Sequence, residues 1–219
     1  MAMLAQASAF EESDLFAAEP PLPAGFAYRD ELITPAEECT LLKRLADLPF
    51  KPFDFHGYLA KRRVVSFGYR YDYSARGLRE SDPIPCFLLP LRAQAAAFAG
   101  VSPDSLQQIL INEYAPGAGI GWHRDRAMFG DVVAVSLSAA SVLRFRRKRV
   151  NRWERGSRNL QPRSAYLLRG ESRWEWQHSI PPVDALRYSV TFRNFVGHDA
   201  AVAVQPPVRT ARRLATRHL

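Results

Sequence analysis

Cysteine, lysine and long apolar runs are scarce in this sequence of 219 residues. The two cysteines, Cys39 and Cys86, have no metal-type spacing and are too few for a disulfide framework, so we expect both to be reduced and at least half buried. No apolar run approaches the 18 residues of a membrane-spanning helix, and the N-terminus lacks the basic start of a signal peptide. These absences favour a cytoplasmic protein without a membrane partner, and we expect a monomer.

Acidic residues are also fewer than basic ones, with 22 Asp and Glu against 30 Lys and Arg. Residues 1–24 hold four acidic and no basic residues, so the remainder of the chain carries a net charge of +12. Of the basic residues 26 are Arg, whose planar guanidinium suits bidentate contacts with phosphate. This charge favours an anionic partner such as a nucleic acid, although it can also serve solubility alone.

The composition divides the chain into three parts. Residues 1–24 are rich in Ala, Glu and Pro without a sustained period, which predicts a flexible N-terminal arm. We predict one folded domain over residues 25–197, because its length and apolar content suffice for a single core. Residues 198–219 form a basic C-terminal tail.

Two helices and then a series of strands are predicted within this domain. Residues 33–48 place Thr34 as the N-cap, Pro35 at the first helical position and Glu37 as the partner that completes a capping box. Residues 86–100 predict a second helix that ends at a glycine. A strand or hairpin is expected over residues 61–77, and short β-type segments follow residue 105 without intervening helices. This order indicates an α+β domain whose strands form an antiparallel sandwich or barrel.

Three residues have the types and spacing of metal ligands. His123 and Asp125 stand two apart in "INEYAPGAGIGWHRDRAMFGD", so an extended backbone would direct both side chains to the same face. This pair alone is weak evidence, because His-x-Asp is common by chance and is more typical of a polar surface turn. His178, at the end of another predicted strand, completes the set of two His and one carboxylate that non-haem Fe(II) oxygenases use.

The segment "RYSVTFR" places Arg187 and Arg193 six residues apart, and therefore on one face of a strand. Two guanidinium groups facing the core would need anionic partners, which a small dicarboxylate could supply. The alternative places both Arg side chains in solvent, with Tyr188, Val190 and Phe192 facing inward.

The segments "NEYAPGAGIGWHRD", "SAYLLRGESRWEWQHSI" and "RYSVTFR" together resemble the AlkB family of Fe(II)/2-oxoglutarate-dependent dioxygenases. The resemblance implies a double-stranded β-helix, or jelly roll, with N-terminal helices and a nucleotide-recognition lid. It implies Fe(II), 2-oxoglutarate and O₂ as cofactor and co-substrates. Its site residues here are His123, Asp125 and His178 as iron ligands and catalytic centre, and Asn112, Tyr114, Arg187, Ser189 and Arg193 at 2-oxoglutarate. The sequence departs from the family at Ser189, where Asn is usual.

The resemblance also implies a nucleic-acid substrate. The segment "RRVVSFGYRYDY" matches the family's lid, and our candidates for substrate binding are Arg62, Arg63, Tyr69 and Tyr71. The basic run over residues 144–158 predicts a hairpin whose tip could hold a phosphate backbone. In both segments a purely structural role is an open alternative.

The expected activity is oxidative demethylation of N-alkylated bases in DNA or RNA, as in DNA repair. Base-demethylating members often carry an acidic residue where this chain has Ala127, and parts of the sequence look closer to the branch that hydroxylates wobble uridines in tRNA. That tRNA activity is the first alternative. Protein demethylation and a non-enzymatic jelly-roll binding module follow.

Overall fold

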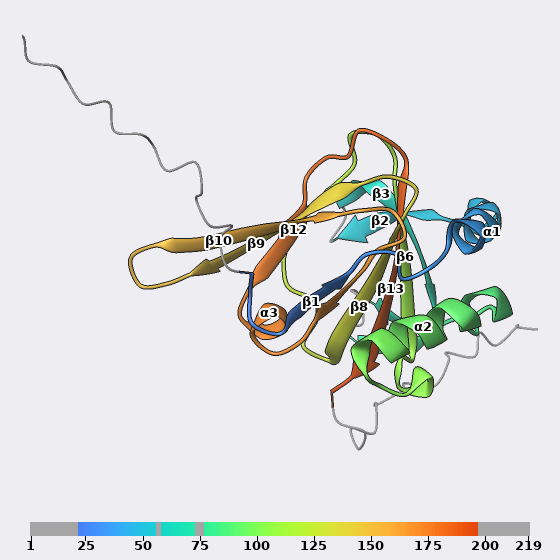
Figure 1. Ribbon diagram of the computed structural model, residues 1–219, viewed down its shortest axis with the longest axis horizontal. Helices are drawn as coiled ribbons and strands as arrows, with labels where there is room; N and C mark the ends of the chain where they lie inside the picture. Colours follow the sequence, from blue (N-terminus) through green and yellow to red (C-terminus); the bar gives the residue numbers. More distant parts are fainter. Residues whose placement is uncertain (1–21, 56–57, 73–76, 197–219) are drawn as a thin grey trace, which may run out of the picture.

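The computed structural model describes residues 22–55, 58–72 and 77–196 of the chain. Two antiparallel sheets face each other, and helices cover the outer side of the larger one (Figure 1). This is the α+β jelly-roll architecture that the sequence predicted. The predicted N-terminal arm and basic tail, residues 1–24 and 198–219, lie almost wholly outside the described residues.

The larger sheet has seven strands in the order β1-β11-β8-β13-β6-β3-β2. Their bounds are β1 Phe26–Arg29, β11 Ala165–Leu168, β8 Phe129–Leu137, β13 Arg187–Phe195, β6 Gln108–Tyr114, β3 Tyr58–Phe67 and β2 Lys51–Phe55. Strand β13 is paired on both sides, with β6 and with β8. It therefore lies in the middle of the sheet, where its register is fixed from two directions.

The smaller sheet has four strands in the order β10-β9-β12-β7. Their bounds are β10 Trp153–Leu160, β9 Ser141–Lys148, β12 Gln177–Ile180 and β7 Ile120–His123. Strands β9 and β10 form the predicted basic hairpin, which projects well beyond the body of the domain (Figure 1). Strands β4 Tyr69–Asp72 and β5 Gly77–Glu80 make a separate two-stranded ribbon.

Both predicted helices are present. Helix α1 spans Pro35–Ala46 and begins with the capping box, in which the Thr34 hydroxyl accepts from the Glu37 amide and the Glu37 carboxylate accepts from the Thr34 amide. Helix α2 spans Leu89–Ala99, after a 3₁₀ turn at Cys86–Leu88, and ends at Gly100 in the left-handed conformation. A second 3₁₀ turn, Pro103–Ser105, leads into β6. None of the helices in the described ranges is long and apolar enough to cross a membrane.

The large sheet has two chemically different faces. Tyr188, Val190 and Phe192 of β13 belong to the apolar core that α1 and α2 cover, whereas Arg187 and Arg193 of the same strand are buried on the opposite side. That opposite side faces the small sheet. The polar face of the large sheet is therefore directed into the sandwich, and the alternative of solvent-exposed Arg side chains is wrong.

Two local expectations need correction. Strands without intervening helices were expected after residue 105, but the short helix α3, Glu171–Trp174, lies between β11 and β12. Cys39 and Cys86 are free thiols, as expected, but both are exposed at the surface rather than set into the core.

Candidate active site

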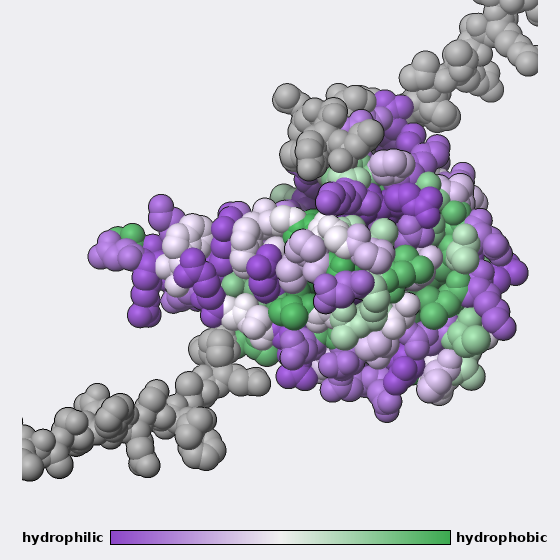
Figure 2. Space-filling view, turned by 90° about the horizontal axis from the view of Figure 1, so that it is seen from above, coloured by the Kyte–Doolittle hydropathy of each residue, from purple (hydrophilic) through white to green (hydrophobic). Residues whose placement is uncertain are grey.

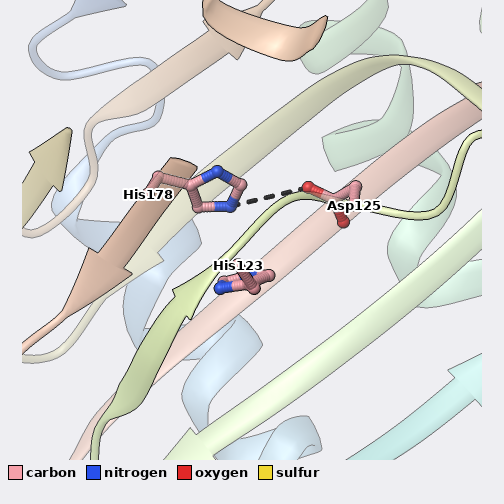
Figure 3. Close-up of side chains that lie close together, drawn as sticks. All are labelled: His123, Asp125 and His178. Atoms are coloured by element: carbon pink, nitrogen blue, oxygen red, sulfur yellow. Dashed lines mark ion pairs between the residues drawn. The ribbon is translucent and has the colours of Figure 1, made fainter. Parts of the chain in front are cut away.

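The three predicted metal ligands lie together at one end of the small sheet (Figure 3). His123 ends β7 and His178 stands opposite it on β12, so the pairing of these two strands sets their rings 4.3 Å apart, centroid to centroid. Asp125 follows β7 by two residues, and its Oδ2 lies 3.5 Å from His178 Nε2. One ligand atom from each residue lies within 4.8 Å of the others. The spacing predicted from the sequence thus produces a cluster of two imidazoles and one carboxylate.

The protonation states of this cluster suit a cation. Burial lowers the pKa of His178 to about 3, and electrostatic interaction with His123 and Arg193 acts in the same direction. Burial also lowers the pKa of His123. For Asp125 burial opposes ionisation, but the neighbouring cationic groups, Arg193 foremost, outweigh it and hold the pKa below its usual range. At neutral pH the site offers two neutral imidazoles and one carboxylate, the forms that bind a divalent metal.

The hydrogen bonds of the two rings leave nitrogen lone pairs available. His123 Nδ1 lies 2.9 Å from the carbonyl oxygen of Gly121, an arrangement that assigns the proton to Nδ1 and leaves Nε2 as an acceptor. His178 Nδ1 is buried without a hydrogen-bond partner in the described part of the chain. Two imidazole nitrogens and a carboxylate oxygen on one side of a site fit non-haem Fe(II).

Arg193 holds the carboxylate ligand in place. Its Nη2 donates to Asp125 Oδ1 at 2.6 Å, and its Nη1 donates to Gln108 Oε1 at 2.9 Å. Asp125 therefore keeps Oδ2 free to face the two histidines. Arg193 Nε is buried without a partner among the described residues, so one donor remains available to a bound anion.

Arg187 is a buried cation without a carboxylate partner in the described structure. The residue is 1% exposed, its Nη2 donates to the Ser136 hydroxyl at 2.8 Å, and its Nε and Nη1 have no hydrogen-bond partner among residues 22–55, 58–72 and 77–196. Its guanidinium carbon lies 5.2 Å from the centre of the Tyr114 ring. Buried unpaired donors on a guanidinium are costly, and a carboxylate is the group that satisfies two of them at once. A bound carboxylate, such as the one expected from 2-oxoglutarate, would satisfy these donors.

The other predicted 2-oxoglutarate residues lie on the same polar face. Asn112 and Tyr114 of β6 are paired with Ser189 and Arg187 of β13, so the four side chains project to the same side of the sheet. Asn112 Oδ1 accepts a hydrogen bond from Arg62 Nε at 3.2 Å. The structure therefore brings together the residues predicted for metal and co-substrate.

A cavity of about 1440 Å³ opens above this cluster. The metal residues, Asn112, Tyr114, Ser189 and Arg193 line it, as do Trp122 and Arg144 of the small sheet. Arg187 does not line it, but its guanidinium group lies over the ring of Tyr114, which does. The cavity is large enough for a co-substrate and part of a second molecule.

The four predicted substrate residues separate into two pairs. Arg62 and Tyr71 line the cavity, where the Arg62 guanidinium lies 3.9 Å from the Phe53 ring centre and Arg126 lies 4.6 Å from that of Tyr71. Arg63 points to the other face of β3, where it pairs with Glu113 at 2.6 Å. Tyr69 packs edge-on against Phe195. Neither Arg63 nor Tyr69 lines the cavity, and their role in substrate binding stays a prediction.

Arg173 is a positioning residue that the sequence did not reveal. It is 2% exposed on helix α3, and its guanidinium donates to the main-chain carbonyls of Asp125, Arg126, Phe129 and Gly130 at 2.6–3.3 Å. One side chain thus holds the loop that carries Asp125. In the sequence, Arg173 stands out only by lying shortly before the metal residue His178. No residue pattern around it predicts that its side chain is buried.

Comparisons with known proteins agree with this site. The sequence pattern of the 2OG-Fe(II) oxygenase superfamily matches residues 40–193. The chain is 31% identical over 147 residues to an "Alkylated DNA repair protein ALKBH8 homolog" of Arabidopsis thaliana, a match that covers 56% of this chain and 42% of that protein. It is 29% identical to the mouse "tRNA (carboxymethyluridine(34)-5-O)-methyltransferase ALKBH8", covering 78% of this chain and 27% of that protein. The chain thus spans less than half the length of these two relatives.

A solved structure shares the fold. "The structure of OsALKBH1" superposes with a TM-score of 0.64 at 15% sequence identity, covering 80% of this chain and 98% of that one. The fold, the cluster of two histidines and one aspartate, and the sequence match over residues 40–193 agree. The chain belongs to the 2OG-Fe(II) oxygenase superfamily, and within it is similar to the ALKBH8 relatives named above.

Proposed function

We propose that this dioxygenase oxidatively demethylates N-alkylated bases in DNA or RNA. The observation that carries the proposal is the cavity, which places the metal residues beneath a wall of basic and aromatic side chains. Such a wall suits a flipped or single-stranded nucleotide, because aromatic and guanidinium groups stack on bases and basic groups pair with phosphate. The Arabidopsis relative, named for alkylated DNA repair, supports the same reading.

The chain's own residues bind and orient the reactants. His123, Asp125 and His178 would hold Fe(II), which when bound couples O₂ and 2-oxoglutarate to hydroxylation of a nearby carbon. Arg187 would bind the distal carboxylate of 2-oxoglutarate through its two unpaired N–H groups. Arg193 keeps Asp125 ionised and oriented. A hydroxylated N-methyl group then leaves as formaldehyde and restores the base.

The substrate side of the cavity supplies positive charge and rings. Arg62, stacked on Phe53, and Arg126, stacked on Tyr71, stand in the cavity wall. Each guanidinium group lies over a ring, and together they give the cavity wall the positive charge and aromatic surface that a nucleotide would contact. Ala127, also in the lining, offers no carboxylate to the edge of a base.

A second candidate is hydroxylation of a modified nucleoside in tRNA. The similarity to the mouse tRNA methyltransferase extends over 78% of this chain, further than the match to the Arabidopsis protein. The lack of an acidic group at Ala127 agrees with a substrate other than a methylated base. Both candidates use the same metal and co-substrate residues, and a protein substrate is the third possibility that the assay must address.

Nucleoside mass spectrometry separates these activities. The protein is incubated with Fe(II), 2-oxoglutarate and either methylated single-stranded DNA, methylated RNA or bulk tRNA, with Asp125→Ala as the inactive control. We expect loss of 1-methyladenine or 3-methylcytosine. A tRNA nucleoside that gains 16 mass units would favour the second candidate instead. Succinate formation with no change in any nucleic acid would contradict both and point to a protein substrate.

A further inference from the structure

The outward face of the small sheet is basic and aromatic, and only part of it lines the cavity of the candidate active site. We call it the Arg–Trp face, and its residues are Trp122, Arg144, Arg146, Lys148, Trp153 and Arg155. The projecting hairpin that bears most of it is largely hydrophilic (Figure 2). The sequence predicted phosphate binding at the tip of this hairpin, whereas the residues of the Arg–Trp face lie along the strands and not at the tip.

Strand register assembles this face. Arg155 is paired with Arg146, and Trp153 with Lys148, so each pair projects to the same side of the β9–β10 hairpin. On the next strand, β12, Gln177 and Ser179 are paired with Arg146 and Arg144. Gln177 accepts from Arg146 Nε at 2.7 Å, and Ser179 accepts from Arg144 Nε at 3.2 Å. These bonds orient the two guanidinium groups, and Arg144 is exposed while Arg146 is half-buried.

Carboxylates are sorted to the opposite side of the sheet. Glu154 is the only acidic residue in the four strands, and its carboxylate accepts from Arg147 Nε at 2.9 Å. Arg147 also binds Glu171 and Glu175 of the α3 region. One arginine thus gathers three carboxylates on the inner side, and the outward face keeps its positive charge without an acidic neighbour on its own strands.

Tryptophan rings alternate with the guanidinium groups across the face. The Arg146 guanidinium carbon lies 4.5 Å from the Trp122 ring centre and 4.9 Å from that of Trp153, and Arg144 lies 5.3 Å from Trp122. Trp153 is 41% exposed although it is a large apolar side chain. Exposed rings beside fixed cations form the kind of platform on which unpaired bases stack while their phosphates meet positive charge.

The Arg–Trp face is continuous with the active site. Trp122 and Arg144 belong both to this face and to the lining of the cavity. Trp122 directly precedes the metal residue His123 in the chain. A single-stranded nucleic acid lying along the Arg–Trp face would therefore reach the cavity without passing an acidic or apolar barrier on these β-strands.

We propose that the Arg–Trp face binds single-stranded nucleic acid, as the track for nucleotides that flank the one entering the cavity. That a nucleotide enters the cavity rests on the proposed function. Binding of the flanking nucleotides to the Arg–Trp face, however, requires neither turnover nor a modified base. The length from Arg144 to Lys148, about 14 Å of extended strand, limits the track to a few nucleotides.

The test measures binding of unmodified, fluorescently labelled 15-nucleotide single strands by anisotropy, using the full chain loaded with Mn(II) and 2-oxoglutarate. The charge variant is Arg146→Gln/Lys148→Gln, and the ring variant is Trp153→Ala; none of these residues lines the cavity. The matched control is Lys43→Gln/Arg44→Gln on α1, which removes the same charge at the far end of the molecule (Figure 1).

We expect the charge variant to weaken binding by on the order of tenfold and to reduce the slope of log K against log salt by about 1.4, since each phosphate contact on a single strand contributes about 0.7. The ring variant is expected to lose at least about fivefold, because stacking on one ring contributes on the order of 1–3 kcal/mol. RNA and DNA strands of the same sequence are both measured, and this loss with either supports the proposal. Binding of Mn(II) and 2-oxoglutarate by both variants should remain within twofold of the parent, which also shows that they fold.

Three results would overturn the proposal. An equal loss in the α1 control would show that only net charge matters. Tighter binding to a duplex of the same sequence would exclude a track for unpaired bases. Binding to phosphatidylserine vesicles that depends on Trp153, without binding to either single strand, would assign the face to a membrane. None of these binding measurements involves a methylated base. The proposed binding face can therefore be confirmed or refuted even if the demethylation assay fails.

Discussion

Replacing Arg187 with methionine tests the co-substrate site directly. The substitution keeps an unbranched side chain but removes a buried cation whose Nε and Nη1 have no partner among the described residues. If these donors await a carboxylate, the ligand-free protein does not depend on them. We therefore expect the metal-free variant to unfold at the same temperature as the parent or slightly higher, because an uncompensated buried charge is removed.

The magnitude follows from the two lost hydrogen bonds. A bond between a charged donor and a charged acceptor contributes about 1.5–3 kcal/mol, so losing two costs at least about 3 kcal/mol of binding free energy. At about 1.4 kcal/mol per factor of ten, the Kd of 2-oxoglutarate should rise at least roughly a hundredfold. The hydrogen bond from Arg187 to Ser136 is lost as well, but the small hydroxyl remains free to rotate toward another acceptor.

Anaerobic calorimetric titration of 2-oxoglutarate into the Mn(II)-loaded protein measures this Kd. Arg92→Met is the matched control, because Arg92 is also largely buried but binds Asp104 and a carbonyl oxygen away from the cavity. A Kd within threefold of the parent would refute the role of Arg187. A large fall in the unfolding temperature of metal-free Arg187→Met, absent from the control, would show that the guanidinium is structural.

Further predictions concern the metal residues and their loop. Asp125→Ala should abolish Mn(II) binding measured by electron paramagnetic resonance, and undiminished binding would rule out this carboxylate as a ligand. The pKa of His178 is lowered to about 3 and that of His123 is also lowered, so protons should compete with Mn(II) only in acid. The affinity for Mn(II) is expected to stay constant between pH 8 and about 6. A tenfold loss of Mn(II) affinity by pH 6 would indicate ordinary exposed imidazoles. Arg173→Lys keeps the charge but not the fork that binds four carbonyls, and roughly tenfold weaker Mn(II) binding is expected by calorimetric titration. Unchanged Mn(II) affinity would mean that the loop carrying Asp125 keeps its conformation without the contacts of Arg173.

Sequence patterns located the metal cluster because two of its three residues are close together in the sequence. His123 and Asp125 are two residues apart, and a strand pairing brings His178 to them. Helix α1 was equally predictable, since its capping box lies within four consecutive residues. Short-range stereochemistry thus decides the capping box and the His123–Asp125 pair, whereas His178 joins them only through the tertiary pairing of β12 with β7.

The orientation of strand residues could not be predicted in the same way. Arg62 and Arg63 are adjacent and of one type, yet one lines the cavity and the other pairs with Glu113 on the helix-covered side. Only the register of β3 against β6 decides which is which. Similarly, Arg173 is buried because the loop over residues 125–130 wraps around its guanidinium, a contact between segments more than 40 residues apart.

Strand β13 also constrains how this enzyme can change over evolution. Its alternate residues serve the apolar core on one side and the site on the other, and both neighbours fix its register. Insertion or deletion of one residue would exchange the two sets, placing guanidinium groups under the helices and Phe192 in the cavity. A change in the length of β13 is therefore not tolerated, whereas the tip of the β9–β10 hairpin, residues 149–152, lies outside the hydrophobic core and can lengthen or shorten without disturbing the metal residues. New substrates are accordingly expected to arise through that hairpin, with β13 inherited unaltered in length.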